Sequence, residues 1–186
     1  MQGGATPLQY ADNIRYWRIK QKRKKKAGLG PRLRQNAKQA RSKRRLDKED
    51  SISGDQFYTK SEIAKKCLDK LSEHVDVNLF DIIIEPSAGT GSFFNLLPVD
   101  KRIGIDLEPN CEGVIQGDYT DFEPPPNKRI AVVGNPPFGI NSKSAVIFFD
   151  HSAKFADIIA FIIPRTWKRI SIQNRLSLDF ELIFNM

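Results

Sequence analysis

The sequence predicts one α/β domain with a mostly parallel sheet over residues 51–186, preceded by a disordered basic arm over residues 1–50. Short apolar runs with the length of buried strands alternate with helical stretches, which is the pattern of a parallel sheet with right-handed crossovers. The charges are also split between the two parts. Residues 1–50 hold 16 Lys and Arg against 4 acids, whereas residues 51–186 hold 14 against 18.

The arm is the basic part of the chain, with five consecutive cations at residues 22–26 and four more over residues 41–45. Like charges repel and the arm has little apolar surface to bury, so we expect it to be disordered when unbound. Such a segment suits contact with nucleic-acid phosphates, while a solvated extension and a nuclear-targeting signal are the alternatives. Tyr10, Tyr16 and Trp17 precede these cations and could stack on bases or cluster locally.

Composition excludes several classes of protein. No apolar run approaches the roughly 20 residues that span a bilayer, and the N-terminus lacks the apolar segment of a signal peptide. We therefore expect a soluble, intracellular protein without membrane contact, either nuclear or cytoplasmic. Cys67 and Cys111 are too few for a disulfide framework and lack the spacing of a metal site, so reduced thiols and no bound metal are expected.

The elements of the domain follow in order from residue 59. Thr59 to Glu62 match a capping box, and apolar side chains recur at helical spacing behind them, which predicts an opening helix. Apolar runs, the third of them weak, then predict strands at residues 80–84, 102–105, 114–115, 130–133 and 158–163. Between these strands, helices are expected over residues 93–97 and 144–155.

A glycine-containing turn follows the first predicted strand, in the stretch Glu85-Pro86-Ser87-Ala88-Gly89-Thr90-Gly91. Ligands of parallel α/β sheets bind at the carboxyl ends of strands, where glycine lets the backbone approach the ligand. No Lys-Ser or Lys-Thr follows the glycines, which excludes a P-loop, and Phe94 stands where a dinucleotide motif has its third glycine. The turn therefore indicates a nucleotide-type site of another kind.

Two acids follow later strands. Asp106 ends the second predicted strand, 21 positions after Glu85, where a carboxylate can accept the hydrogens of ribose hydroxyls. Asp118, in Gly117-Asp118-Tyr119, follows the third strand. An ordinary polar strand end for Asp106 and a turn residue for Asp118 are the alternatives.

The stretch Asn135-Pro136-Pro137-Phe138 comes directly after the fourth predicted strand. An exocyclic amine on an aromatic ring is a poor nucleophile, because its lone pair is delocalised into the ring. If the Asn135 side-chain oxygen and the Pro136 carbonyl each accept one amine hydrogen, the lone pair turns out of the ring plane toward a methyl donor. The prolines hold both acceptors rigid, and Phe138 offers a face on which a base can stack. A simple turn is the alternative.

The chain order of these motifs, from Phe-x-Thr at residues 57–59 through the glycine loop and the two acids to Asn-Pro-Pro-Phe, resembles gamma-class (TaqI-type) N6-adenine methyltransferases. The resemblance covers residues 55–175. It implies a Rossmann-like class I methyltransferase fold and methyl transfer from S-adenosylmethionine (AdoMet) to adenine N6 in DNA or RNA. It also implies that residues 57–59 hold the methionine end of AdoMet and that Asp118 accepts from its adenine amino group.

The candidate site residues form two groups. The cofactor-binding candidates are Phe57, Tyr58, Thr59, Glu85, Pro86, Ala88, Gly89, Gly91, Asp106, Leu107, Asp118 and Tyr119. The catalytic candidates are Asn135, Pro136, Pro137 and Phe138. Together they predict an AdoMet-dependent N-methyltransferase with a nucleic acid as partner.

Two departures from the family pattern leave alternatives open. Phe138 stands where many DNA-adenine enzymes and the glutamine-methylating release-factor enzymes have Tyr, so a protein glutamine amide is an alternative acceptor. The family sheet ends in a pair of strands after the fifth, and the chain after residue 163 has room for one of them. We therefore expect a truncated C-terminus or a partner protein that completes the sheet. A catalytically inactive nucleic-acid-binding module is the alternative from another class.

Residues 164–169, Pro-Arg-Thr-Trp-Lys-Arg, follow the fifth predicted strand at the same edge as the candidate site. Their three cations and Trp167 could hold a phosphate and a splayed base. The alternative is the start of an amphipathic helix with solvated charges.

Overall fold

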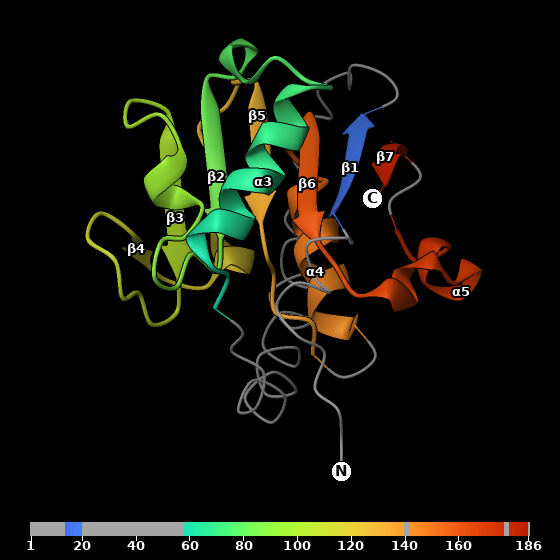
Figure 1. Ribbon diagram of the computed structural model, residues 1–186. Helices are drawn as coiled ribbons and strands as arrows, with labels where there is room; N and C mark the ends of the chain where they lie inside the picture. The colour runs from blue at the N-terminus through green and yellow to red at the C-terminus, as the bar shows by residue number, and fades with distance from the viewer. Residues whose placement is uncertain (1–13, 20–57, 140–141, 177–178, 186) are drawn as a thin grey trace, which may run out of the picture.

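The computed structural model describes residues 14–19, 58–139, 142–176 and 179–185 as an α/β fold on one open, mixed sheet (Figure 1). In this part of the chain the sheet has seven strands in the order β4-β3-β2-β5-β6-β1-β7. They are β1 (Ile14–Ile19), β2 (Ile82–Pro86), β3 (Arg102–Asp106), β4 (Ile115–Gln116), β5 (Ile130–Gly134), β6 (Ile158–Ile162) and β7 (Phe180–Asn185). Strands β2 to β6 are parallel, whereas β1 is antiparallel to both of its neighbours.

Two helices cover opposite faces of the sheet. α3 (Ser61–Ser72) packs on one face and α4 (Lys143–Ser152) on the other, because alternate residues of each central strand join different cores. In β2, for example, Ile83 joins the α3 core while Ile82 and Ile84 join the α4 core. Burial on both faces explains why the central strands are continuous apolar runs in the sequence.

Short elements connect the strands. They are the 3-10 turns η1 (Val77–Leu79), η2 (Phe94–Leu96), η3 (Tyr119–Asp121) and η5 (Arg165–Lys168) and the short helix α5 (Ile170–Gln173). The helix expected over residues 93–97 is thus only the turn η2, which ends before Pro98. None of the described helices is long and apolar enough to cross a membrane.

The start of α3 differs from the predicted capping box. Lys60 occupies the N-cap position, and no side chain caps the helix there. The Thr59 hydroxyl instead accepts a hydrogen bond from the side chain of Asn135. The residue that the sequence predicts as a helix cap therefore contacts the candidate site.

Strand β1 corrects the expectation that the whole of residues 1–50 lies outside the folded domain. It runs between β6 and β7 and pairs with both (Figure 1). Trp17 is buried against Phe149 and Trp167, with ring centroids 5.1 and 5.9 Å away, so this indole clusters in the core. The rest of the arm and Tyr10 lie outside the described residues.

β1 also changes the expectation about the far end of the sheet. Two strands lie beyond β6, and the position next to β6 is taken by this N-terminal strand of the same chain. The buried guanidinium of Arg15 fixes the strand by donating to the Trp167 carbonyl at 3.2 Å. No strand from a partner protein is needed at that position.

Candidate functional site

A pocket opens at the carboxyl ends of β2, β3 and β5, where the order of the strands reverses. From β2 the chain moves outward to β3 and β4, and it then returns to β5 on the other side of β2. Diverging connections leave a crevice at such a point, which is where open α/β sheets bind ligands. The pocket has a cavity volume of about 140 Å³ and is open to solvent on one side.

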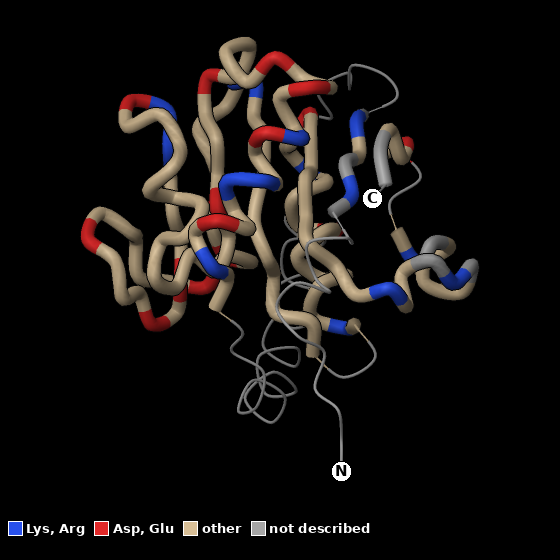
Figure 2. Tube along the Cα trace, viewed as in Figure 1, with Lys and Arg blue, Asp and Glu red and all other residues tan. Residues whose placement is uncertain are grey.

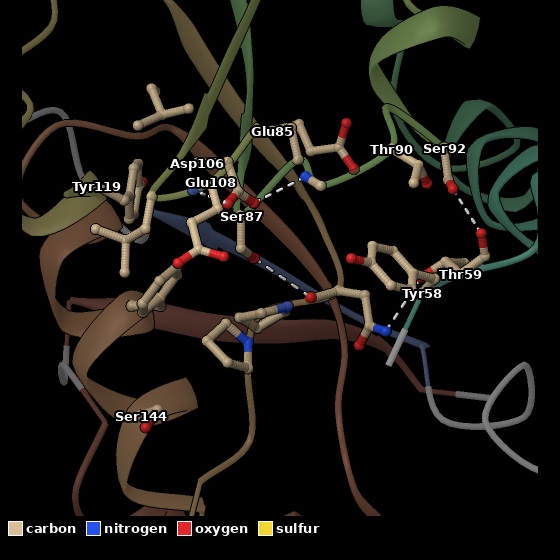
Figure 3. Close-up of a pocket in the computed structure, with 18 of the residues that line it drawn as sticks. Tyr58, Thr59, Glu85, Ser87, Thr90, Ser92, Asp106, Glu108, Tyr119 and Ser144 are labelled. Carbon is tan, nitrogen blue, oxygen red and sulfur yellow. Dashed lines mark hydrogen bonds between the residues drawn. The ribbon is translucent and has the colours of Figure 1, made fainter. Parts of the chain in front are cut away.

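The pocket brings most of the predicted site residues together (Figure 3). Nine cofactor-binding candidates line it: Tyr58, Thr59, Glu85, Ala88, Gly89, Asp106, Leu107, Asp118 and Tyr119. The four catalytic candidates, Asn135, Pro136, Pro137 and Phe138, line it as well. Pro86, the last residue of β2, and Gly91, in the loop that follows it, do not line the pocket, and Phe57 lies outside the described residues.

The pocket also contains residues, mostly small or polar, that were not among the candidate site residues, although some of them stand within the predicted motifs. They are Ser87, Thr90, Ser92, Ile105, Glu108, Gly117, Gly139, Ser144 and Phe148. Glu108 had a usable signal, since it is a second acid two residues after Asp106. Ser144 and Phe148 had none, because only the packing of α4 decides which of its side chains reach the pocket.

Backbone geometry explains the glycines of the loop after β2. Gly89 and Gly91 have φ of 51° and 77°, in the left-handed region that glycine adopts without strain. A Cβ on Gly91 would lie 2.5 Å from the Cys111 sulfur, so a side chain here would displace the loop or its neighbour. Ser87 shares the left-handed conformation, with φ of 55°, and such strain clusters at functional sites.

Glu85 holds this loop from the inside. Its side chain is buried, and its carboxylate accepts the backbone N–H groups of Phe93 and Phe94. Burial raises the pKa of Glu85 to about 8, the two N–H bonds oppose the rise, and the Asp106 carboxylate adds to it. Glu85 therefore acts on the pocket chiefly by positioning the loop that lines it.

We expect the free energy of unfolding to fall as pH rises from about 4.5 to about 8. In this window the unfolded chain has lost the Glu85 proton while the folded chain retains it, so a higher pH favours unfolding. Urea unfolding at several pH values measures this loss, which should be smaller in the Glu85→Gln variant. An equal pH dependence in the variant and the wild-type protein would contradict the assignment to Glu85.

Asp106 connects the glycine loop to the end of β3. One carboxylate oxygen accepts the Gly89 N–H at 2.8 Å, and the other accepts the Glu108 N–H at 2.9 Å. Figure 3 shows Asp106 and Glu108 side by side on the pocket wall. Each carboxylate oxygen has two lone pairs, so Asp106 can still accept two hydroxyl hydrogens from a ligand.

Asp118 and Tyr119 stand at the start of η3 and play different parts. Asp118 accepts hydrogen bonds from the backbone N–H and the hydroxyl of Thr120, both at 2.8 Å, which fixes the turn. Tyr119 is buried, its hydroxyl is 2.7 Å from that of Ser152, and its ring contacts Phe148. Tyr119 thus shapes the floor of the pocket from the core.

Asn135 is fixed from two directions at the end of β5. Its side-chain nitrogen donates to the Thr59 hydroxyl at 3.1 Å, and its backbone carbonyl accepts from the Ser87 hydroxyl at 3.4 Å. The side-chain oxygen of Asn135 is buried and has no hydrogen-bond partner within the described chain. This buried acceptor therefore needs a partner that the described chain does not supply.

Tyr58 and Thr59 reach the pocket from the segment before α3. The Tyr58 ring lies against the glycine loop, since a Cβ on Gly89 would be 3.3 Å from it. The Ser92 hydroxyl donates to the Thr59 carbonyl, which ties this segment to the same loop (Figure 3).

Two aromatic residues predicted to stack on a base differ in exposure. Phe138 lines the pocket and is partly buried against the α4 core. Trp167 is fully buried and packs on Trp17 and Phe149, so the hypothesis that it holds a splayed base is wrong. Its indole stabilises the attachment of β1, and this burial leaves no ring face for a base.

Known proteins give no further assignment. A scan against models of protein families and a search of curated proteins each found no match to this chain. The pocket itself is the basis for a functional conclusion.

Proposed function

We propose that this protein transfers a methyl group from AdoMet to an exocyclic amino group, with adenine N6 in a nucleic acid as the acceptor. The observation that carries the proposal is the Asn135 side-chain oxygen, which is buried at the pocket without a hydrogen-bond partner in the described chain. Buried acceptors without partners are rare in folded proteins, so a donor group of a ligand is the expected partner. An amino group supplies such a donor.

The strand order supports the finer fold that this function requires, the Rossmann-like fold of class I methyltransferases. In that fold a pair of strands completes the sheet beyond the fifth parallel strand. Here β1 and β7 lie in those two positions, although β1 comes from the N-terminal part of the chain. The glycine loop, Asp106 and Asn135 then stand at the ends of the first, second and fourth parallel strands.

The pocket residues fit AdoMet. Gly89 lines the pocket beside β2, Asp106 retains lone pairs for the ribose hydroxyls, and Asp118 suits the adenine amino group. When bound, AdoMet supplies a sulfonium methyl whose C–S bond breaks as the N–C bond forms, the sulfur keeping the electron pair and the amine releasing a proton.

Asn135 and Pro136 would orient the acceptor. With one amine hydrogen accepted by the Asn135 side-chain oxygen and the other by the Pro136 carbonyl, the nitrogen lone pair leaves conjugation with the ring. Because Pro136 and Pro137 fix the backbone, both acceptors need little reorganisation during the reaction. Phe138, partly exposed to the pocket, offers an apolar contact for the base.

Exposed cations outside the pocket suit a nucleic acid as the acceptor, whereas the charged residues that line the pocket itself are the acids Glu85, Asp106, Glu108 and Asp118. The part of the fold near β3 and β4 carries acidic residues, whereas cations lie in η5, on either side of α5 in the sequence and at the start of α4 (Figure 2). These exposed cations, which we call the basic rim, are Lys143, Arg165, Arg169 and Arg175. Exposed cations of this kind contact the phosphates of a nucleic acid.

Charge reversal of the basic rim should weaken nucleic-acid binding. We expect Arg165→Glu with Arg169→Glu to lower the affinity for a single-stranded oligonucleotide by about tenfold or more at low salt, and to reduce the salt dependence, because fewer counterions are released. Lys66→Glu, on the exposed side of α3, is the matched control. Fluorescence anisotropy over a salt series measures both quantities, and equal affinities for all proteins would contradict a role for the rim.

Transfer of labelled methyl from AdoMet into single-stranded and double-stranded DNA and RNA tests the function, with products digested to nucleosides and identified by mass. We expect N6-methyladenine, formed faster in single strands, because flipping a base out of a duplex costs a few kcal/mol. Label in a glutamine-containing peptide instead would assign a protein amide as the acceptor. No transfer together with no saturable AdoMet binding would favour a catalytically inactive nucleic-acid-binding module.

A further inference from the structure

We propose that Thr59 is a positioning residue that holds the side-chain amide of Asn135 in place at the pocket, an inference that rests on the function proposed above. Resemblance to a family assigns Thr59 to the methionine end of AdoMet. The geometry assigns it a different task, because its hydroxyl is bonded to the side chain of Asn135.

The two residues meet although they are 76 positions apart in the sequence. The Asn135 side-chain nitrogen donates to the Thr59 hydroxyl at 3.1 Å. Thr59 is itself held in place, because its carbonyl accepts from the Ser92 hydroxyl on the glycine loop (Figure 3). The contact therefore joins the segment before α3, the loop after β2 and the end of β5.

The position of the Asn135 amide matters for the chemistry. The oxygen and nitrogen ends of an Asn side chain have nearly the same size, but only the oxygen accepts a hydrogen bond. With the nitrogen on Thr59, the oxygen is the buried atom left without a partner. If the amide were displaced, this oxygen would no longer meet the acceptor amine, and the lone pair would not be turned out of conjugation.

Removal of the Thr59 hydroxyl isolates this effect. Thr59→Val keeps the shape of the side chain and removes the hydroxyl that contacts the Asn135 amide, so the amide loses a contact that holds it in place. We expect kcat to fall by about 10- to 100-fold, since a small misplacement of a reacting group has effects of this size. AdoMet affinity, measured by calorimetric titration, should stay unchanged. Thr59→Ser keeps a hydroxyl and should restore kcat close to the wild-type value.

A second readout is independent of turnover. The side-chain amide of Asn135 gives a pair of ¹H–¹⁵N resonances, which can be assigned by their loss in Asn135→Asp. We expect these resonances to shift in Thr59→Val and to keep their positions in Thr59→Ser, while the spectrum of the remaining backbone amides stays folded in both.

The outcomes separate the alternatives. Unchanged Asn135 resonances in Thr59→Val would overturn the inference, even if the wild-type protein transfers no methyl group to any acceptor. Loss of AdoMet affinity with an unchanged kcat at saturating AdoMet would also overturn it, in favour of a cofactor contact. A wild-type protein without transfer, but with shifted resonances in Thr59→Val, would reject the proposed function while retaining the positioning contact.

Discussion

Replacing Asn135 by alanine is expected to lower kcat for methyl transfer by about 10²- to 10³-fold, the usual effect of losing one preorganised hydrogen-bonding group at a reacting atom. The variant removes the buried side-chain oxygen that has no partner in the described chain. Without it, one amine hydrogen has no acceptor and the lone pair stays in conjugation with the ring. Single-turnover transfer of labelled methyl, with AdoMet saturating, measures the effect.

The controls for Asn135→Ala distinguish activation of the amine from loss of binding. AdoMet affinity should stay close to that of the wild-type protein, because the proposal assigns the Asn135 side-chain oxygen to the amine that receives the methyl group and not to the cofactor. Asn78→Ala, on the exposed surface of η1, is the matched substitution and should leave transfer unchanged. Retained transfer in Asn135→Ala would contradict the proposed role, and a loss of AdoMet binding alone would make Asn135 a cofactor residue.

The sequence predicted the strands, and the site at their carboxyl ends, where local apolar patterns and the rules of parallel sheets lead to the same result. Continuous apolar runs bounded by turn residues located β2, β3, β5 and β6 within one or two residues at most ends. The carboxyl ends of parallel strands meet at one edge of a sheet, so motifs far apart in the sequence were expected to share one site. The pocket brings together Glu85, Asp106 and Asn135 as that rule requires.

The parts that the sequence did not predict depend on contacts between distant segments. β1 lies within a strongly basic stretch, and its cations concealed the alternation that buries Arg15 and Trp17 on one face of the sheet. Thr59 has a local pattern typical of a helix cap, yet a contact with Asn135 takes its hydroxyl. Trp167 stands among cations, but the packing of β1 buries it.

Replacing Trp17 by alanine should lower the free energy of unfolding by about 3–5 kcal/mol, the usual cost of deleting a large buried aromatic side chain. Trp17 is only 4% exposed, and its indole contacts Phe149 of α4 and Trp167 of η5. The cavity left by the deletion would lie between β1 and α4, so the loss includes the contacts of both. Urea unfolding followed by far-UV circular dichroism measures the change.

Arg18→Ala is the matched control on the same strand, because the Arg18 side chain is 59% exposed and pairs with Glu181 at the surface. This substitution should change stability by about 0.5 kcal/mol or less, since exposed ion pairs contribute little. The Trp167→Phe variant adds a direct observation, because the chain holds two Trp residues and Trp17 is then the remaining one. Emission typical of a buried indole in that variant, together with a large loss of stability in Trp17→Ala, requires β1 to be part of the folded sheet. Solvent-exposed emission and an unchanged stability would instead contradict the placement of β1 in the sheet, and the position next to β6 would then be open.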